Sequence, residues 1–205
     1  FVQWDEALKR DAAGRKKELS EEIGWIESRR GDMLGFWSKV EEGTIPTRVT
    51  HNDTKINNIL FDRQGEVLCA IDLDTVMAST SLNDFGDAIR SYANTGDEDD
   101  RDLSRVGLSL EMFRAYTEGY LSQRAKQLTD SEIDHLAFSA RYITFEQVLR
   151  FLMDYIDGDT YYKIKYPGHN LVRTHAQYRL LQSMEEHYGE MCRIVRETVD
   201  KYRKA

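Results

Sequence analysis

The sequence predicts a mainly helical protein that carries one small β-hairpin. The 205 residues contain only two prolines, and most of the chain consists of long charged segments with apolar residues at helical spacing. Only residues 47–75 show the short apolar runs and turn residues that are typical of strands. The chain is long enough for one or two domains with a sizeable core.

Helical patterns cover the chain on both sides of this region. The first expected helix covers residues 5–30, and a second apolar cluster, 33–40, follows the break at Gly31-Asp32. Further helices are expected at 84–93, 109–124, 129–158 and 171–203. The helix at 129–158 opens on Thr129-Asp-Ser-Glu132, which is a capping-box signature.

The strand region combines a hairpin with a polar loop. Residues 58–61 and 67–71 are apolar runs separated by the turn Asp62-Arg-Gln-Gly65. The segment THNDTKINNILF, residues 50–61, has a low helix propensity because Asn and Asp side chains compete for backbone hydrogen bonds. We therefore expect a loop that presents polar groups, followed by a buried strand that ends at Asp72.

Charge and cysteine content exclude several classes of protein. The net charge of 28 − 36 = −8 argues against a general nucleic-acid or membrane-surface binder. Cys69 and Cys192 are set among apolar residues, so no disulfide framework is expected and a cytoplasmic location fits best. No uncharged apolar run approaches the ~18 residues that span a bilayer. The charged N-terminus is not signal-like and lacks an initiator Met, which suggests a mature form or a fragment.

The polar loop and the next strand carry groups that suit phosphoryl transfer. Asp53 can accept a proton from a hydroxyl nucleophile, Asn58 offers a neutral oxygen, and Asp72 follows an apolar run. Carboxylate and amide oxygens are hard ligands of the kind that Mg²⁺ prefers. The pattern H-x-D-x4-N, from His51 to Asn58, followed by a metal-binding aspartate is that of protein-kinase sites.

These segments resemble a known superfamily. THNDTKINNILFD and AIDLDTVM are similar to the catalytic segments of the aminoglycoside phosphotransferases and choline kinases, which share the protein-kinase fold. HNDTKINN, IDLDTVM, DFGDAIR and RFLMDYIDGDTYYK most resemble the N-acetylhexosamine 1-kinase branch, over residues 45–190. The resemblance implies the C-terminal lobe of a protein-kinase-like phosphotransferase, which uses ATP and Mg²⁺ to phosphorylate a sugar hydroxyl, most closely an N-acetylhexosamine at its anomeric position.

The same resemblance assigns the catalytic roles. The resemblance implies that Asp53 is the catalytic base and that Asn58 and Asp72 are the ligands of the magnesium ion. Asp74 is a neighbouring acidic group placed to reach the metal through water.

The supporting and substrate-binding roles follow in the same way. His51 braces the loop, Asp87 braces it from below, and Arg150 and Tyr161 contact the sugar. The literal triplet Asp84-Phe-Gly spells the kinase metal-binding motif, but no apolar strand precedes it. We expect Asp84 to cap a helix instead.

The resemblance also predicts a domain organisation. Residues 1–46 are expected to form an N-terminal helical segment of the lobe, and residues 47–205 its catalytic and substrate-binding part. No glycine-rich strand-turn-strand with a downstream Lys–Glu pair precedes residue 47, so we expect the ATP-binding N-terminal lobe to be missing and the chain alone to be inactive.

Other functions compete with this prediction. The acceptor is alternatively another small alcohol, such as an aminoglycoside or a choline-like molecule, or the chain is a non-catalytic kinase-like binding lobe. LCAIDLDTV also resembles the opening motif of haloacid-dehalogenase phosphatases, but everything after Asp74 indicates helix rather than alternating strands. His169, His175, His187 and Cys192 match no common zinc spacing.

Overall fold

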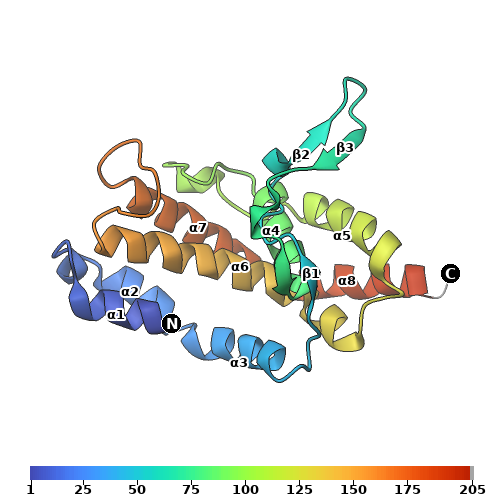
Figure 1. Ribbon diagram of the computed structural model, residues 1–205, viewed down its shortest axis with the longest axis horizontal. Helices are drawn as coiled ribbons and strands as arrows, with labels where there is room; N and C mark the ends of the chain where they lie inside the picture. Colours follow the sequence, from blue (N-terminus) through green and yellow to red (C-terminus); the bar gives the residue numbers. More distant parts are fainter. Residues whose placement is uncertain (204–205) are drawn as a thin grey trace.

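The structure, a computed structural model, describes residues 1–203, and the mainly helical class is confirmed (Figure 1). The helices are α1 (Val2–Arg10), α2 (Ser20–Glu27), α3 (Arg30–Glu41), α4 (Ser81–Tyr92), α5 (Leu110–Arg124), α6 (Asp130–Ile156), α7 (His169–Glu186) and α8 (Tyr188–Arg203). The strands are β1 (Arg48–Thr50), β2 (Ile59–Phe61), β3 (Val67–Ala70) and β4 (Met77–Ser79). The long helices α6 and α7 run side by side through the middle of the molecule.

The four strands form two separate antiparallel pairs. β2 and β3 make the predicted hairpin, with Leu60 opposite Cys69. β1 pairs with β4, with Val49 opposite Ala78, and this second pair was not predicted. Since β1 and β4 flank the hairpin in the sequence, residues 51–58 and 71–76 connect one sheet to the other. The polar loop is therefore fixed at both of its ends.

The hairpin projects from the helices, and the expectation of a buried strand was wrong (Figure 1). All four residues of β3 are exposed, and Val67 and Leu68 are 64% and 63% exposed. An apolar run predicts a strand whose side chains favour burial. It does not identify the surface that buries them, which can lie outside the residues described. Here the described part of the chain leaves β3 uncovered.

Two expected helices are broken. The pattern at 5–30 divides at Asp11, which has a left-handed φ of 42° and ends α1, before Gly14 with a φ of 67°. Such conformations stop a helix because L-residues rarely adopt them. The pattern at 171–203 divides at His187, between α7 and α8. Gly31 lies inside α3, so the expected break there was wrong. The capping box of Thr129 and Glu132 is confirmed.

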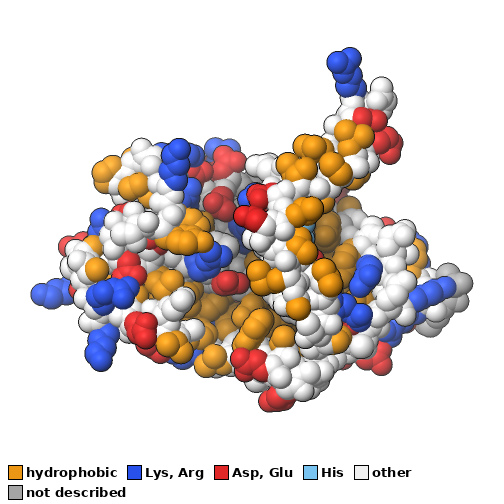
Figure 2. Space-filling model, viewed as in Figure 1, with side chains coloured by type: hydrophobic (Ala, Val, Ile, Leu, Met, Phe, Trp, Pro, Cys, Tyr) orange, Lys and Arg blue, Asp and Glu red, His pale blue; other side chains and the backbone are white. Residues whose placement is uncertain are grey.

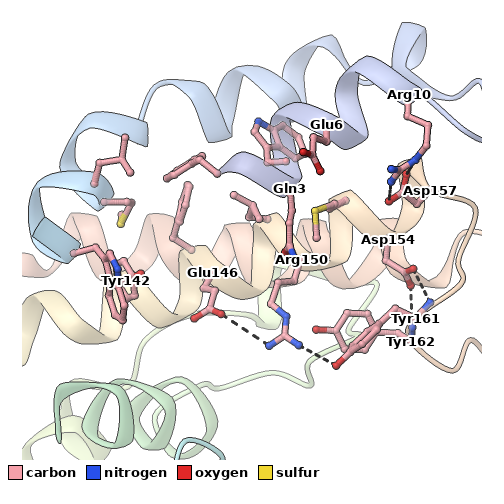
Figure 3. Close-up of a pocket in the computed structure, with 18 of the residues that line it drawn as sticks. Gln3, Glu6, Arg10, Tyr142, Glu146, Arg150, Asp154, Asp157, Tyr161 and Tyr162 are labelled. Atoms are coloured by element: carbon pink, nitrogen blue, oxygen red, sulfur yellow. Dashed lines mark hydrogen bonds and ion pairs between the residues drawn. The ribbon is translucent and has the colours of Figure 1, made fainter. Parts of the chain in front are cut away.

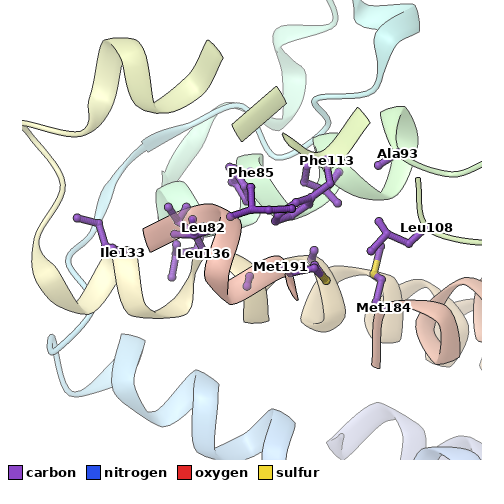
Figure 4. Packing of buried hydrophobic residues seen from close by; sticks show 14 of the residues in the cluster. Leu82, Phe85, Ala93, Leu108, Phe113, Ile133, Leu136, Met184 and Met191 are labelled. Carbon is purple, nitrogen blue, oxygen red and sulfur yellow. The ribbon is translucent and has the colours of Figure 1, made fainter. Parts of the chain in front are cut away.

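The main core lies where α4 and α5 meet α6, α7 and α8. Phe85 and Phe113 meet edge to face, and Leu136 and Met191 pack against the same cluster (Figure 4). Gly86 lets α4 touch α6, because a methyl group there would overlap the carbonyl oxygen of Ser139. This close approach fixes the helix that carries both Asp84 and Asp87.

A second core joins the N-terminal helices to α6. Trp4, Ile26 and Met33 pack with Phe145 and Leu152 in one buried cluster. Burial of such side chains stabilises by about 1.5–3 kcal/mol each. Residues 1–46 therefore share their apolar contacts with the longest helix of the structure.

Two further expectations can be compared with the structure. Cys69 and Cys192 are both free, as expected for a chain without a disulfide framework. Among residues 1–203, no helix has the length and the apolar content needed to cross a membrane.

Candidate active site

The polar loop of residues 51–58, which is the candidate catalytic loop and is called the catalytic loop below, is held in place by α4. The carboxylate of Asp84 accepts hydrogen bonds from the backbone N–H groups of His51 (3.0 Å) and Asn52 (2.7 Å). The hydroxyl of Thr75 donates to the carbonyl of His51 at 2.6 Å. The loop backbone is thus fixed by side chains that lie more than twenty residues further along the chain.

Asp53 lies at the centre of the loop and is bonded to two of its neighbours. Its Oδ2 accepts from Lys55 Nζ and from Asn58 Nδ2, both at 2.7 Å, and Asn58 Nδ2 also donates to the carbonyl of Asp53 at 2.9 Å. Burial raises the pKa of Asp53, but the hydrogen bonds from Lys55 and Asn58 outweigh it and the pKa is lowered. Asp53 is therefore ionised at neutral pH.

Asp72 follows directly after a residue that pairs with Asn58. The N–H of Ile71 donates to the carbonyl of Asn58 at 2.9 Å, and Asp72 then turns the chain with a left-handed φ of 63°. The pKa of Lys55 is raised, chiefly by its hydrogen bond to Asp53 and also by the charges of Asp53, Asp72 and Asp87, while burial lowers it by less. Three carboxylates therefore act on one ammonium group. Asp74 is exposed in the short turn Leu73–Thr75.

The supporting residues partly differ from expectation. His51 Nε2 lies 3.0 Å from the carbonyl of Ile71, so it connects the loop to the end of β3. Asp87 pairs mainly with Arg90 at 2.9 Å and reaches the loop only at Thr54 Oγ1, 3.5 Å away. The expected capping role of Asp84 was wrong, because Thr80 is the N-cap of α4. Its carboxylate is occupied by the two loop N–H groups.

A pocket of about 840 Å³ opens between α1, α3, α6 and the loop after α6, on the face that Figure 2 shows hollowed near its centre. Arg150 and Tyr161 both line it, and Figure 3 shows them side by side. Apolar side chains of α1, α3 and α6 form much of the rest: Trp4, Met33, Leu34, Trp37, Phe145, Leu149 and Met153.

Arg150 is only loosely held by protein groups. Its Nη2 lies 3.4 Å from the Tyr161 hydroxyl, and its Nη1 lies 4.0 Å from Glu146. The guanidinium also lies over the rings of Tyr161 and Tyr162, at 5.7 and 5.6 Å from their centres. A cation with long, weak partners retains donors for a ligand.

A buried ion pair of α4 acts electrostatically on both the catalytic loop and the pocket. Arg90, only 8% exposed, bonds to Asp87 and to Glu98. The positive charge of Arg90 acts on the carboxylate of Asp53. On the pocket side, burial raises the pKa of Glu146, Arg150 lowers it, and Asp87 raises it again. The two groups of predicted residues therefore share electrostatic neighbours.

Sequence reasoning missed Lys55 as the partner of Asp53. The available signal was its position only two residues after Asp53, where its positive charge can pair with the ionised carboxylate. Sequence reasoning also missed the role of Asp84, since hydrogen bonds to backbone leave no residue pattern. Glu146 lies one helical turn before Arg150, and this i, i+4 spacing was the available signal.

The lobe and its loop together define a class. A mainly helical lobe that carries an H-x-D-x4-N loop and, two residues after β3, an aspartate is consistent with the C-terminal lobe of a kinase-like phosphotransferase. The family model described as "APH: Phosphotransferase enzyme family" matches residues 2–122, which is more than half of the chain. The chain belongs to this family. The match ends within α5, so it does not extend to Arg150 and Tyr161.

Proposed function

We propose that the chain is the catalytic and acceptor-binding lobe of an ATP-dependent kinase for a sugar hydroxyl, with an N-acetylhexosamine phosphorylated at its anomeric position. The observation that carries the proposal is the ionised Asp53, hydrogen-bonded to Lys55 and Asn58, with the charge of Asp72 also acting on Lys55. The choice of sugar rests on the resemblance of the segments around Arg150 and Tyr161.

Asp53 acts as the base in this proposal. It orients the acceptor hydroxyl and takes its proton as the bond from that oxygen to the γ-phosphorus of ATP forms and the bond from this phosphorus to the leaving ADP breaks. A lowered pKa suits this role, because the transition state of phosphoryl transfer is loose and needs positioning more than strong basicity. In the same proposal Lys55, which forms an ion pair with Asp53, offsets the charge of the transferred phosphoryl group.

The donor atoms of Asn58 and Asp72 fit a magnesium ion. Asn58 uses its amide nitrogen on Asp53, which leaves the amide oxygen to face a cation, and Asp72 presents an exposed carboxylate. Both are hard oxygen ligands, and Asp74 would add an outer carboxylate. When bound, the ion would neutralise charge on the phosphate oxygens of the donor.

The acceptor is proposed to lie in the pocket that Arg150 and Tyr161 line. Polar groups at one end and aromatic and aliphatic walls at the other are typical of small-molecule sites, which usually measure 300–1,000 Å³. Arg150 and Glu146 supply a donor and an acceptor for sugar hydroxyls, since the contact between them is long, at 4.0 Å, and both line the pocket.

The nucleotide side is proposed to need groups beyond these residues. Within residues 1–203, several large apolar side chains on the strands that flank the catalytic loop are exposed. They are Val49, Leu60, Phe61, Leu68 and Met77. We propose that an ATP-binding lobe covers this surface and that residues 1–205 alone do not turn over.

The test is an acceptor panel with the protein that carries its nucleotide-binding lobe. ATP-dependent phosphorylation of N-acetylhexosamines, hexoses, choline and an aminoglycoside is followed by phosphorus NMR, which distinguishes an anomeric phosphate from other esters. A sugar 1-phosphate supports the proposal, and preferred turnover of choline or the aminoglycoside overturns it.

A second experiment tests the need for a nucleotide-binding lobe. Calorimetry on residues 1–205 should show little ATP binding, and a micromolar affinity for ATP would contradict that need.

A further inference from the structure

We infer that Asp154 is a positioning residue, which fixes the acceptor loop, residues 157–162, and so places Tyr161. Asp154 lies near the end of α6 and is 5% exposed. Its Oδ1 accepts from the N–H groups of Thr160 (2.9 Å) and Tyr161 (2.8 Å), and its Oδ2 accepts from that of Tyr162 (3.0 Å). This inference rests on the proposed function, which makes Tyr161 a substrate contact.

A fourth donor completes the set around this carboxylate. The side chain of Asn170, fully buried at the start of α7, donates to Asp154 Oδ2 at 2.8 Å and to Asp159 Oδ1 at 2.9 Å. Arg15 then bonds to the other oxygen of Asp159 at 2.7 Å. Although Asp154 lines the pocket, its oxygens are engaged by the protein, so its role is to hold the loop rather than to bind a ligand.

Tyr161 depends on this support because its side chain has few contacts of its own. It is 72% exposed, its hydroxyl meets Arg150 at 3.4 Å, and its ring lies edge-on to Tyr162 (Figure 3). The loop contains no helix or strand and passes through left-handed conformations at Gly158 and Asp159. Its course is thus set by the carboxylate, and the guanidinium of Arg150, from α6, lies over the rings of both Tyr161 and Tyr162.

The experiment replaces Asp154 by Asn in the enzyme that carries its nucleotide-binding lobe. Asn keeps the size but loses the charge and turns an NH₂ group toward N–H donors. We expect kcat/KM for the sugar to fall by about 10²-fold, chiefly through KM, with kcat and the KM for ATP changed little. Amide exchange at 160–162 should accelerate. Ser183→Ala is the matched control. It removes a buried side-chain oxygen that accepts a backbone N–H, that of Leu108, at a position away from the pocket.

A double-mutant cycle separates positioning from general destabilisation. In a Tyr161→Ala background, Asp154→Asn should raise the acceptor KM little further, because the residue it places is gone. An equal rise in both backgrounds would overturn the inference, as would an unchanged KM despite faster exchange. Should Asp154→Asn not fold, Asn170→Ala removes one donor and is measured in the same way.

The outcome also separates this inference from the proposed function. If the native enzyme phosphorylates no sugar, the proposed function has failed, whatever the exchange data show. If it does so and the variant keeps its acceptor KM, only the inference about Asp154 has failed.

Discussion

The catalytic loop and the acceptor loop are supported alike but differ in how their functional side chains are held. An aspartate from a helix accepts the backbone N–H groups of each loop, Asp84 for the first and Asp154 for the second. Asp53 is then bonded to its own neighbours, whereas Tyr161 extends into the pocket with one long hydrogen bond. The Asp53 side chain is thus ordered before a substrate binds, whereas the Tyr161 side chain retains freedom to adjust to its ligand.

The largest effect should come from removing the base. With the nucleotide-binding lobe present, Asp53→Asn should lower kcat roughly 10²–10⁴-fold, the range for loss of a general base. The acceptor KM should change less, because Asp53 acts chiefly in the transition state. Steady-state kinetics checks this. Asp62→Asn, in the hairpin turn, is the control and should turn over normally; near-normal turnover by Asp53→Asn would refute the base assignment.

The next effect concerns the junction of β1, α4 and α6, where Glu132 bonds to Arg48 and Ser81, and it depends on pH. Burial raises the pKa of Glu132, but Arg48, the N–H of Thr129 and the Ser81 hydroxyl outweigh it and hold that pKa at about 2, below its usual 4.5. Because the folded pKa is the lower one, this stabilisation, on the order of 3 kcal/mol, is present above pH 4.5 and is lost as the pH falls toward 2.

Glu132→Gln tests this assignment. Urea unfolding of residues 1–205 from pH 7 to pH 2.5 should show the variant less stable at neutral pH and nearly equal to the native chain at the acid end. A stability difference that stays constant with pH would show that the carboxylate is not what stabilises the junction of β1, α4 and α6.

Removing the brace under the catalytic loop should have a smaller effect on turnover. Asp84→Asn weakens the acceptor of two loop N–H groups, and we expect kcat to fall roughly 10–10²-fold through misplacement of Asp53, with the acceptor KM retained. Thr80→Ala is the comparison, because it removes the N-cap of α4 and should cost about 1 kcal/mol of stability while kcat stays the same. Equal kcat values for the two variants would assign Asp84 a purely structural role.

The smallest of these effects lies on the acceptor side. Arg150→Lys keeps the charge but loses the planar group that lies over Tyr161 and Tyr162, so we expect the acceptor KM to rise about tenfold with kcat nearly unchanged. Initial rates over a range of sugar concentrations measure this change. A fall in kcat with KM constant would move Arg150 from the acceptor side to the chemical step.

The predictable part of the site is the part whose groups are close in sequence. His51, Asp53 and Asn58 lie within eight residues, so their types and spacing alone carried the phosphotransferase hypothesis. Asp84 and Asp154 act on backbone N–H groups instead. Any residue offers such a group, so no sequence pattern marks the partner, and an aspartate early in a helix is more simply explained as a cap.

The fold was predictable to the same extent. Helical periodicity identified every long helix, but the divisions at Asp11 and His187 depend on local backbone conformations that periodicity does not contain. The pairing of β1 with β4 joins residues almost thirty positions apart and was missed for that reason. The burial assumed for β3 was wrong because an apolar run does not identify its partner.

The projecting hairpin also governs how the isolated chain behaves in the test tube. Two short strands with open edges and exposed Val67, Leu68 and Phe61 offer a template on which further copies can add. The net charge of −8 keeps the copies apart, and salt screens that repulsion. Preparations of residues 1–205 should therefore stay clear longest when they are dilute and low in salt, and should turn cloudy as either concentration rises.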